Sequence, residues 1–180
     1  MKHLILFVCI CSISIAFGQD KKITVEKIWK DYEFYPAGVD GFRSMNDGNY
    51  FSKTTKTTDG KSVTKHKFSD YKGEGETIIP SELLANIGMD DYSFNSDETK
   101  ALISTKTKAI YRRSYSAVYY LIDLNTKDVQ PLDSKRQPQT LAEYSPDGKK
   151  VSYIYKNNLY VKDIASGNVT QLTKDGEFNK

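Results

Sequence analysis

Short apolar runs alternate with polar turns along most of this chain. After Pro36 the runs are bounded by Gly, Asp and Asn, which is typical of β-strands joined by tight turns. Before it, residues 23–29 (ITVEKIW) space their apolar side chains unevenly, as in a short amphipathic helix. Thr24 is its expected N-cap. The pattern predicts a β-rich domain that follows an N-terminal segment, residues 19–40, with one short helix.

The polar turns recur at a fixed spacing. FRSMNDGNYFSK, YSFNSDETKALIST and AEYSPDGKKVSYIY each place an aspartate between two apolar strands, at Asp47, Asp97 and Asp147. Each aspartate stands fifty residues after the last. An Asp carboxylate accepts hydrogen bonds from nearby backbone amides, so these residues are predicted to form turns rather than to catalyse a reaction.

The later part of each unit repeats as well. AVYYLIDLNTKDVQPL and NNLYVKDIASGNVTQLT share an apolar strand, an aspartate (Asp123 or Asp163), a polar turn and a closing strand. About four strands per fifty residues is the size of one β-propeller blade. We therefore predict an all-β fold, a partial β-propeller of about three four-stranded antiparallel blades, near residues 41–90, 91–140 and 141–180.

Three blades are too few for closure, because propellers use about four to eight. We expect the sequence to be the start of a longer protein: a fragment, a truncated reading frame, or a piece completed by another chain. No segment resembles an α/β-hydrolase domain.

The second unit departs from the repeat. Asp97 and Asp123 are 26 residues apart, whereas Asp147 and Asp163 are 16 apart. The ten additional residues fall around TKTKAIYRRSYS, and insertions in repeat arrays often form the binding face. Arg112 and Arg113 belong to this departure. Read as a strand, they would point to opposite faces, so at most one would enter a cavity. Two solvated arginines remain the alternative.

The first eighteen residues have the layout of a secretory signal peptide, with Lys2 and His3, an apolar run, and small residues before a cleavage point after Gly18. Cleavage predicts export, periplasmic or extracellular, with no membrane span in the mature chain; a retained anchor is the alternative. Both cysteines lie inside this segment. The mature chain would therefore contain no disulfide and depend on burial for its stability.

Other chemistry is scarce. The formal charge of +3 without a basic block argues against nucleic-acid binding. No Gly-x-Ser-x-Gly, zinc cluster, calcium loop or phosphate loop occurs, so no cofactor, metal site or catalytic residue is assigned. His66 is the one histidine beyond the signal segment, on what reads as an exposed strand, and is an improbable general base.

The stretch YRRSYSAVYYLIDLN resembles the W/Y-R-H-S-Y-T-A-x-Y-x-I-Y-D-L segment of the dipeptidyl peptidase IV family, serine peptidases of the prolyl oligopeptidase type. The matching residues are Tyr111, Arg112, Ser114, Tyr115, Ala117, Tyr119, Asp123 and Leu124. The flanking repeats and PAGVDGFRSMNDGNYFS are similar to family segments too. The likeness extends from about Ile23 to the end of the chain.

The resemblance implies an N-terminal propeller of eight blades, followed by an α/β-hydrolase domain that releases Xaa-Pro or Xaa-Ala dipeptides from free peptide N-termini. It implies that Arg112 contacts a backbone carbonyl of the bound dipeptide, while Arg113 stands where the family often has His and receives no role. The family's Glu-Glu pair, which binds the substrate amine, and its triad are absent from this sequence. The chain alone is expected to be inactive, and a homodimer through regions outside it stays open.

A non-catalytic periplasmic or surface propeller of the TolB-like type is the alternative function. A generic propeller gives no reason for the departure around Arg112, which favours the peptidase.

Overall fold

The computed structural model describes residues 22–36 and 38–178. The chain divides into two compact units, Met1–Gly38 and Val39–Lys180. The predicted signal segment, residues 1–18, lies outside the described residues. Within the described ranges, no helix is long and apolar enough to cross a membrane.

In the described part of the first unit, residues 25–29 form a short helix, α2, Val25–Trp29. Its N-cap is Thr24, whose side-chain oxygen accepts a 3.2 Å hydrogen bond from the amide of Lys27. This bond satisfies one of the amides that a helix start leaves without a partner. The predicted helix and its cap are confirmed.

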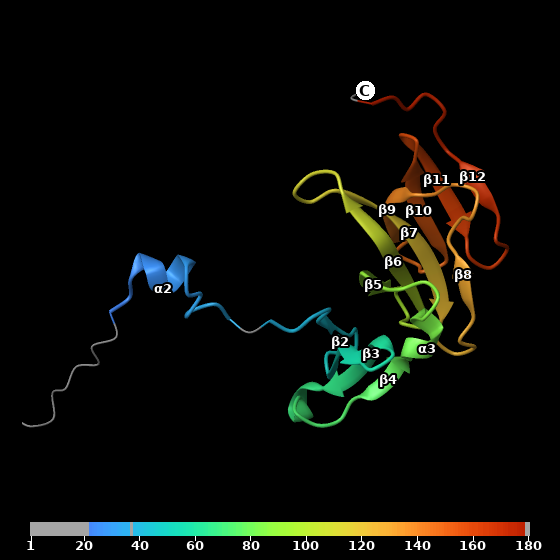
Figure 1. Cartoon of the computed structure of the whole chain (residues 1–180). Helices are drawn as coiled ribbons and strands as arrows, with labels where there is room; N and C mark the ends of the chain where they lie inside the picture. The colour runs from blue at the N-terminus through green and yellow to red at the C-terminus, as the bar shows by residue number, and fades with distance from the viewer. Residues whose placement is uncertain (1–21, 37, 179–180) are drawn as a thin grey trace, which may run out of the picture. The chain divides into compact units, whose positions relative to one another are not determined.

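The second unit is built from three consecutive antiparallel meanders of four strands, as propeller blades are (Figure 1). The first meander comprises β1 (Arg43–Ser44), β2 (Tyr50–Thr57), β3 (Gly60–Lys67) and β4 (Glu76–Ile79). The second comprises β5 (Asp91–Phe94), β6 (Lys100–Ala109), β7 (Tyr115–Asp123) and β8 (Val129–Pro131). The third comprises β9 (Gln139–Tyr144), β10 (Lys150–Tyr155), β11 (Asn158–Asp163) and β12 (Val169–Gln171). A 3-10 turn (Phe68–Asp70) and helix α3 (Ser81–Leu84) lie in connections. The prediction of an antiparallel, propeller-like β fold is confirmed.

The repeating aspartates form turns, as predicted. The Asp47 carboxylate accepts from the amides of Asn49 and Tyr50, and Asp97 and Asp147 accept from the amide two residues further on. Gly48 and Gly148 follow with positive φ, a conformation that an L side chain rarely adopts. The turn between the first two strands of each meander therefore follows from local sequence chemistry.

Two apolar clusters lie between neighbouring meanders. Ala101 and Ile103 of β6 pack with Val63 of the first meander, while Leu102, between them, packs with Val151 of the third. Side chains alternate along a strand, so the middle meander contributes one face to each cluster. Every meander thus buries its apolar residues against a neighbour rather than alone.

His66 is a correction. The sequence suggested an exposed strand, but the side chain is buried and stacks on Phe51 with the ring centroids 5.3 Å apart. Burial, followed by the positive charge of Lys53, lowers the pKa of His66, although a hydrogen bond that the ring donates to the Gly73 backbone acts in the opposite direction. His66 shares its face of β3 with Ser62 and Thr64, which are buried too, so the polar residue types on this face concealed its burial.

Candidate functional site

The departure from the repeat is an extended hairpin. β6 and β7 have ten and nine residues, whereas their counterparts β10 and β11 have six each. The connecting loop spans residues 110–114, against the two-residue turn 156–157 of the third meander. The lengthened strands and loop account for the ten additional residues, so the insertion is confirmed at the predicted place.

The loop at the end of this hairpin presents two arginines to solvent. The Ser114 carbonyl accepts hydrogen bonds from the amides of Ile110 (2.8 Å) and Tyr111 (3.1 Å), which closes the loop tightly. Arg112 and Arg113 are both exposed within it. The strand alternation expected for these arginines is wrong, because β6 ends at Ala109 and β7 begins only at Tyr115.

The base of the hairpin is held by its neighbours. Ser116 and Ala117 of β7 pair with Thr140 and Gln139 of β9, which joins the second and third meanders into one sheet. On the other strand, the Thr107 amide donates a 2.8 Å bond to the Asp90 carboxylate. The loop therefore extends from a base with partners on both sides.

A polar cavity of about 200 Å³ lies at this base. Tyr115 and Tyr119 of β7 line it, together with Arg43, Ser93 and Glu143. The last three stand at the same register in the first strand of each meander, fifty residues apart. Sequence reasoning missed this cavity, although the spacing that revealed the turns also gives these three positions.

Arg43 carries the positive charge of the cavity. Its Nε donates a 2.6 Å bond to the Tyr92 carbonyl and its Nη2 a 2.7 Å bond to the Asp91 carboxylate. These bonds cross from β1 to β5 and fix the first meander against the second. The Arg43 guanidinium thus already holds two strands together, whereas the exposed Arg112 guanidinium is accessible to a ligand.

The two tyrosines of the cavity supply hydroxyl groups. Burial, and next the nearby Tyr115, raise the pKa of Tyr119, so its phenol stays protonated at neutral pH. Among the described residues no group of three or more His, Cys, Asp or Glu side chains could hold a metal ion. The groups that line the cavity and could hydrogen-bond a ligand are hydroxyls, the Arg43 guanidinium and the carboxylates of Asp91 and Glu143.

Comparison with known proteins shows that the extended hairpin lies in a region that matches a known protein family. The family model that matches is the dipeptidyl peptidase IV N-terminal region, over residues 95–180, which include the whole extension. Together with a relative that is 36% identical over 84% of this chain, this match shows that the chain belongs to the dipeptidyl peptidase IV family, as part of its N-terminal propeller region. The YRRSY loop, identified from the sequence as the family resemblance, lies within the matched part.

Individual relatives agree. A protein of Schizosaccharomyces pombe that bears the name of a dipeptidyl aminopeptidase is 40% identical over 101 residues, 53% of this chain and 13% of its own. One of Sordaria macrospora, a dipeptidyl-aminopeptidase B by name, is 36% identical over 154 residues, 84% of this chain and 14% of its own. The crystal structure of Porphyromonas gingivalis dipeptidyl peptidase 4 matches with a TM-score of 0.71 and 26% identity, covering 89% of this chain and 23% of that one.

The chain of this dipeptidyl peptidase IV family member spans less than a fifth of the length of these curated relatives. The part that this chain plays in the activity of a complete protein is therefore a proposal.

Proposed function

We propose that this protein is the N-terminal propeller part of an exported serine dipeptidyl aminopeptidase, which releases Xaa-Pro or Xaa-Ala dipeptides from free peptide N-termini. The family membership and the names of the relatives support the reaction class. The predicted signal peptide, cleaved after Gly18, supports export to the periplasm or beyond. In this proposal the propeller binds and admits the peptide, and the chain alone does not hydrolyse it.

The observation that carries the proposal is the extended β6–β7 hairpin with its exposed Arg112. A repeat unit needs neither the longer strands nor the loop, as the third meander demonstrates. A guanidinium offers several N–H donors in a fixed plane, a geometry suited to a backbone carbonyl. In our proposal Arg112 donates to a carbonyl of the bound dipeptide, and Arg113 remains a solvated charge.

One arginine contact supplies little affinity by itself, because binding must first offset lost freedom of motion. A substrate amine would need a carboxylate clamp, and the reaction would need a serine nucleophile, both expected from other parts of the protein. The partner class is therefore peptides with a free N-terminus. A homodimer through regions outside this chain belongs to the same proposal.

The test uses the complete reading frame that encodes this chain. The purified product should release p-nitroaniline from Gly-Pro-p-nitroanilide and leave the N-terminally blocked substrate uncleaved. Residues 19–180 produced separately should cleave neither. A complete protein without hydrolysis of the free substrate, or with equal cleavage of the blocked one, would show that the proposal is wrong.

A further inference from the structure

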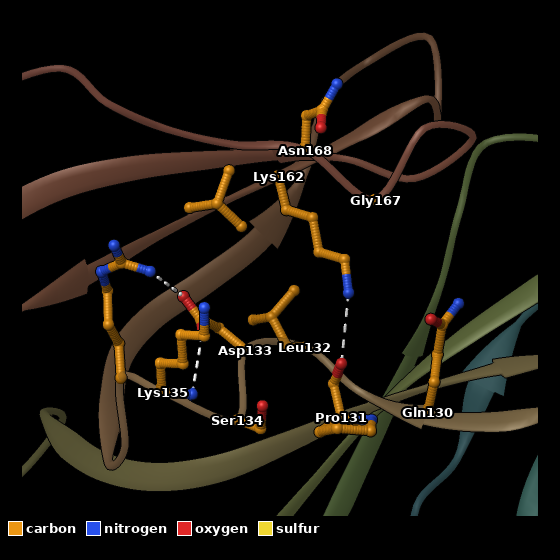
Figure 2. A pocket seen from close by; sticks show the side chains of 11 residues that line it. Gln130, Pro131, Leu132, Asp133, Ser134, Lys135, Lys162, Gly167 and Asn168 are labelled. Atoms are coloured by element: carbon orange, nitrogen blue, oxygen red, sulfur yellow. Dashed lines mark hydrogen bonds and ion pairs between the residues drawn. The ribbon is translucent and has the colours of Figure 1, made fainter.

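A second cavity, separate from the arginine loop, lies between the outer strands of the second and third meanders. It has a volume of about 480 Å³. Residues 130–136 of β8 and the connection after it form one wall, and residues 167–169 at the β11–β12 turn form the other (Figure 2). The side chain of Lys162, from β11, crosses between the two walls (Figure 2).

Lys162 is buried, with 7% of its surface exposed. Its Nζ donates a 3.2 Å hydrogen bond to the Pro131 carbonyl, the one hydrogen-bond acceptor of this ammonium among the described residues (Figure 2). An ammonium has three N–H donors, so two directions are open to other acceptors. Burial lowers the pKa of Lys162, because it disfavours the charged form of the amine. The negative charge of Asp133 acts in the opposite direction but is the smaller effect.

The fold does not demand a lysine at this position. Strand pairing places Lys162 beside Val151, as it places Ile122 beside Ala101 in the second meander. Ile122 is fully buried in the first apolar cluster. In the second meander, a hydrocarbon side chain thus fills the position that Lys162 occupies in the third. A buried ammonium that the fold does not need is a candidate for binding.

The charges that line the cavity favour an anion. The lining contains one carboxylate, that of Asp133, and three cationic side chains, those of Lys135, Arg136 and Lys162. Asp133 already accepts hydrogen bonds from Arg136 (2.8 Å) and Tyr153 (2.5 Å). Little of its capacity is left for Lys162. Arg136 and Asp133 already form an ion pair, so the buried charge that remains to be balanced is the single one of Lys162, which one negative charge on a ligand matches.

We propose that this cavity binds a small carboxylate, which accepts hydrogen bonds from Lys162 Nζ beside the β11–β12 turn. The carboxylate could belong to a free organic acid or to a glutamate side chain, since both present the same planar monoanion. Charge-assisted bonds of this type are stronger than neutral ones.

Saturation-transfer NMR on the complete protein tests the site with butyrate and with N-acetylglutamate amide, at constant ionic strength. Both probes should show saturable transfer, and butyramide, the neutral analogue, should show none. Lys162→Met should weaken the affinity about tenfold or more. Lys135→Met, which removes an exposed charge from the same cavity, should weaken it less than about threefold. Transfer from the glutamate model alone would assign the site to a protein partner's side chain.

Lys162→Met should fold, because an isoleucine fills the equivalent position, and its thermal unfolding confirms this. The proposal is overturned if Lys162→Met binds butyrate as wild type does, if butyramide binds equally, or if phosphate binds more tightly. It is likewise overturned if neither butyrate nor N-acetylglutamate amide shows saturable transfer up to about 100 mM, where even a weak site would be occupied.

Discussion

The phenol of Tyr153 donates a 2.5 Å hydrogen bond to the carboxylate of Asp133, and both side chains are buried. Tyr153 belongs to β10, while Asp133 lies in the connection from β8 to β9. Burial works to raise the pKa of the Asp133 carboxyl, but hydrogen bonds from Tyr153 and Arg136 outweigh it and lower that pKa. The bond links the third meander to the segment that leads into it.

Removal of this donor should destabilise the protein. Tyr153→Phe leaves a buried carboxylate with two donors, Arg136 and the Lys135 amide, and should lower the free energy of unfolding by about 1–3 kcal/mol. Urea unfolding with an unchanged m-value measures this loss. Tyr144→Phe is the matched control: its hydroxyl is buried without a partner among the described residues. Removing that hydroxyl should leave stability unchanged or higher.

Alanine substitutions at Gly48 and Gly148, which occupy equivalent turns, distinguish the cost of backbone strain from the cost of steric crowding. Gly48 and Gly148 have φ of 69° and 67°, yet a Cβ on Gly48 would meet nothing within 4 Å, and one on Gly148 would lie 2.8 Å from Ser96 Oγ. Gly48→Ala should cost about 1 kcal/mol from the left-handed conformation alone. Gly148→Ala should cost at least about 1 kcal/mol more, because Ser96 and the buried Asn95 must shift. Equal unfolding midpoints for the two variants would show that the contact at Gly148 is relieved without cost.

The fold could be predicted because it rests on local chemistry that repeats. An Asp turn and its flanking apolar strands recur every fifty residues, and three such units fix an antiparallel meander architecture. The same comparison located the extended hairpin from the spacing of Asp97 and Asp123 alone. Strand length and turn position are short-range properties, so a single sequence carries them.

What the sequence could not predict depends on long-range packing. The arginines lie in a loop because β6 contains an irregularity between Thr105 and Lys108 and ends at Ala109, which simple alternation does not show. His66 is buried because it stands opposite Phe51 in the β2–β3 pair, and the two rings stack. The cavity around Arg43 and Glu143 forms only when separate meanders come together. The sequence around each of these residues does not show such contacts, although the fifty-residue spacing does give the positions of Arg43 and Glu143 in their strands.

Asp123 should make stability depend on pH in the acid range. Its carboxylate pairs with Lys100 and accepts from the amides of Asn125 (2.9 Å) and Thr126 (3.0 Å). The Lys100 hydrogen bond, then those from the backbone, lowers the pKa of Asp123 to about 2. The unfolded value is about 3.9, so this stabilisation is present above that pH and is lost as the pH falls toward 2.

Asp123→Asn should therefore lower the free energy of unfolding by about 1 kcal/mol at neutral pH, since the ion pair is partly exposed. The gap to wild type should close between about pH 4 and pH 2. Asp163→Asn is the control: the Asp163 carboxylate accepts a comparable turn bond from the Ser166 amide, but it forms no ion pair among the described residues, so its effect should be smaller. A constant gap across this range would contradict the assignment to the charged form.

Arg112 and Arg113 should differ in their effect on hydrolysis by the complete enzyme. Both are exposed in the same loop, so neither substitution should alter the unfolding midpoint. If Arg112 donates to a dipeptide carbonyl, Arg112→Ala should lower kcat/KM for Gly-Pro-p-nitroanilide about ten- to a hundredfold, the loss expected for a charge-assisted hydrogen bond. Arg113→Ala should change it less than about threefold, as expected for a solvated charge. Arg112→Lys keeps the charge but loses the planar donor pair, so it should restore only part of the rate. Equal kcat/KM for the Arg112→Ala and Arg113→Ala enzymes would show that Arg112 makes no specific contact with the substrate.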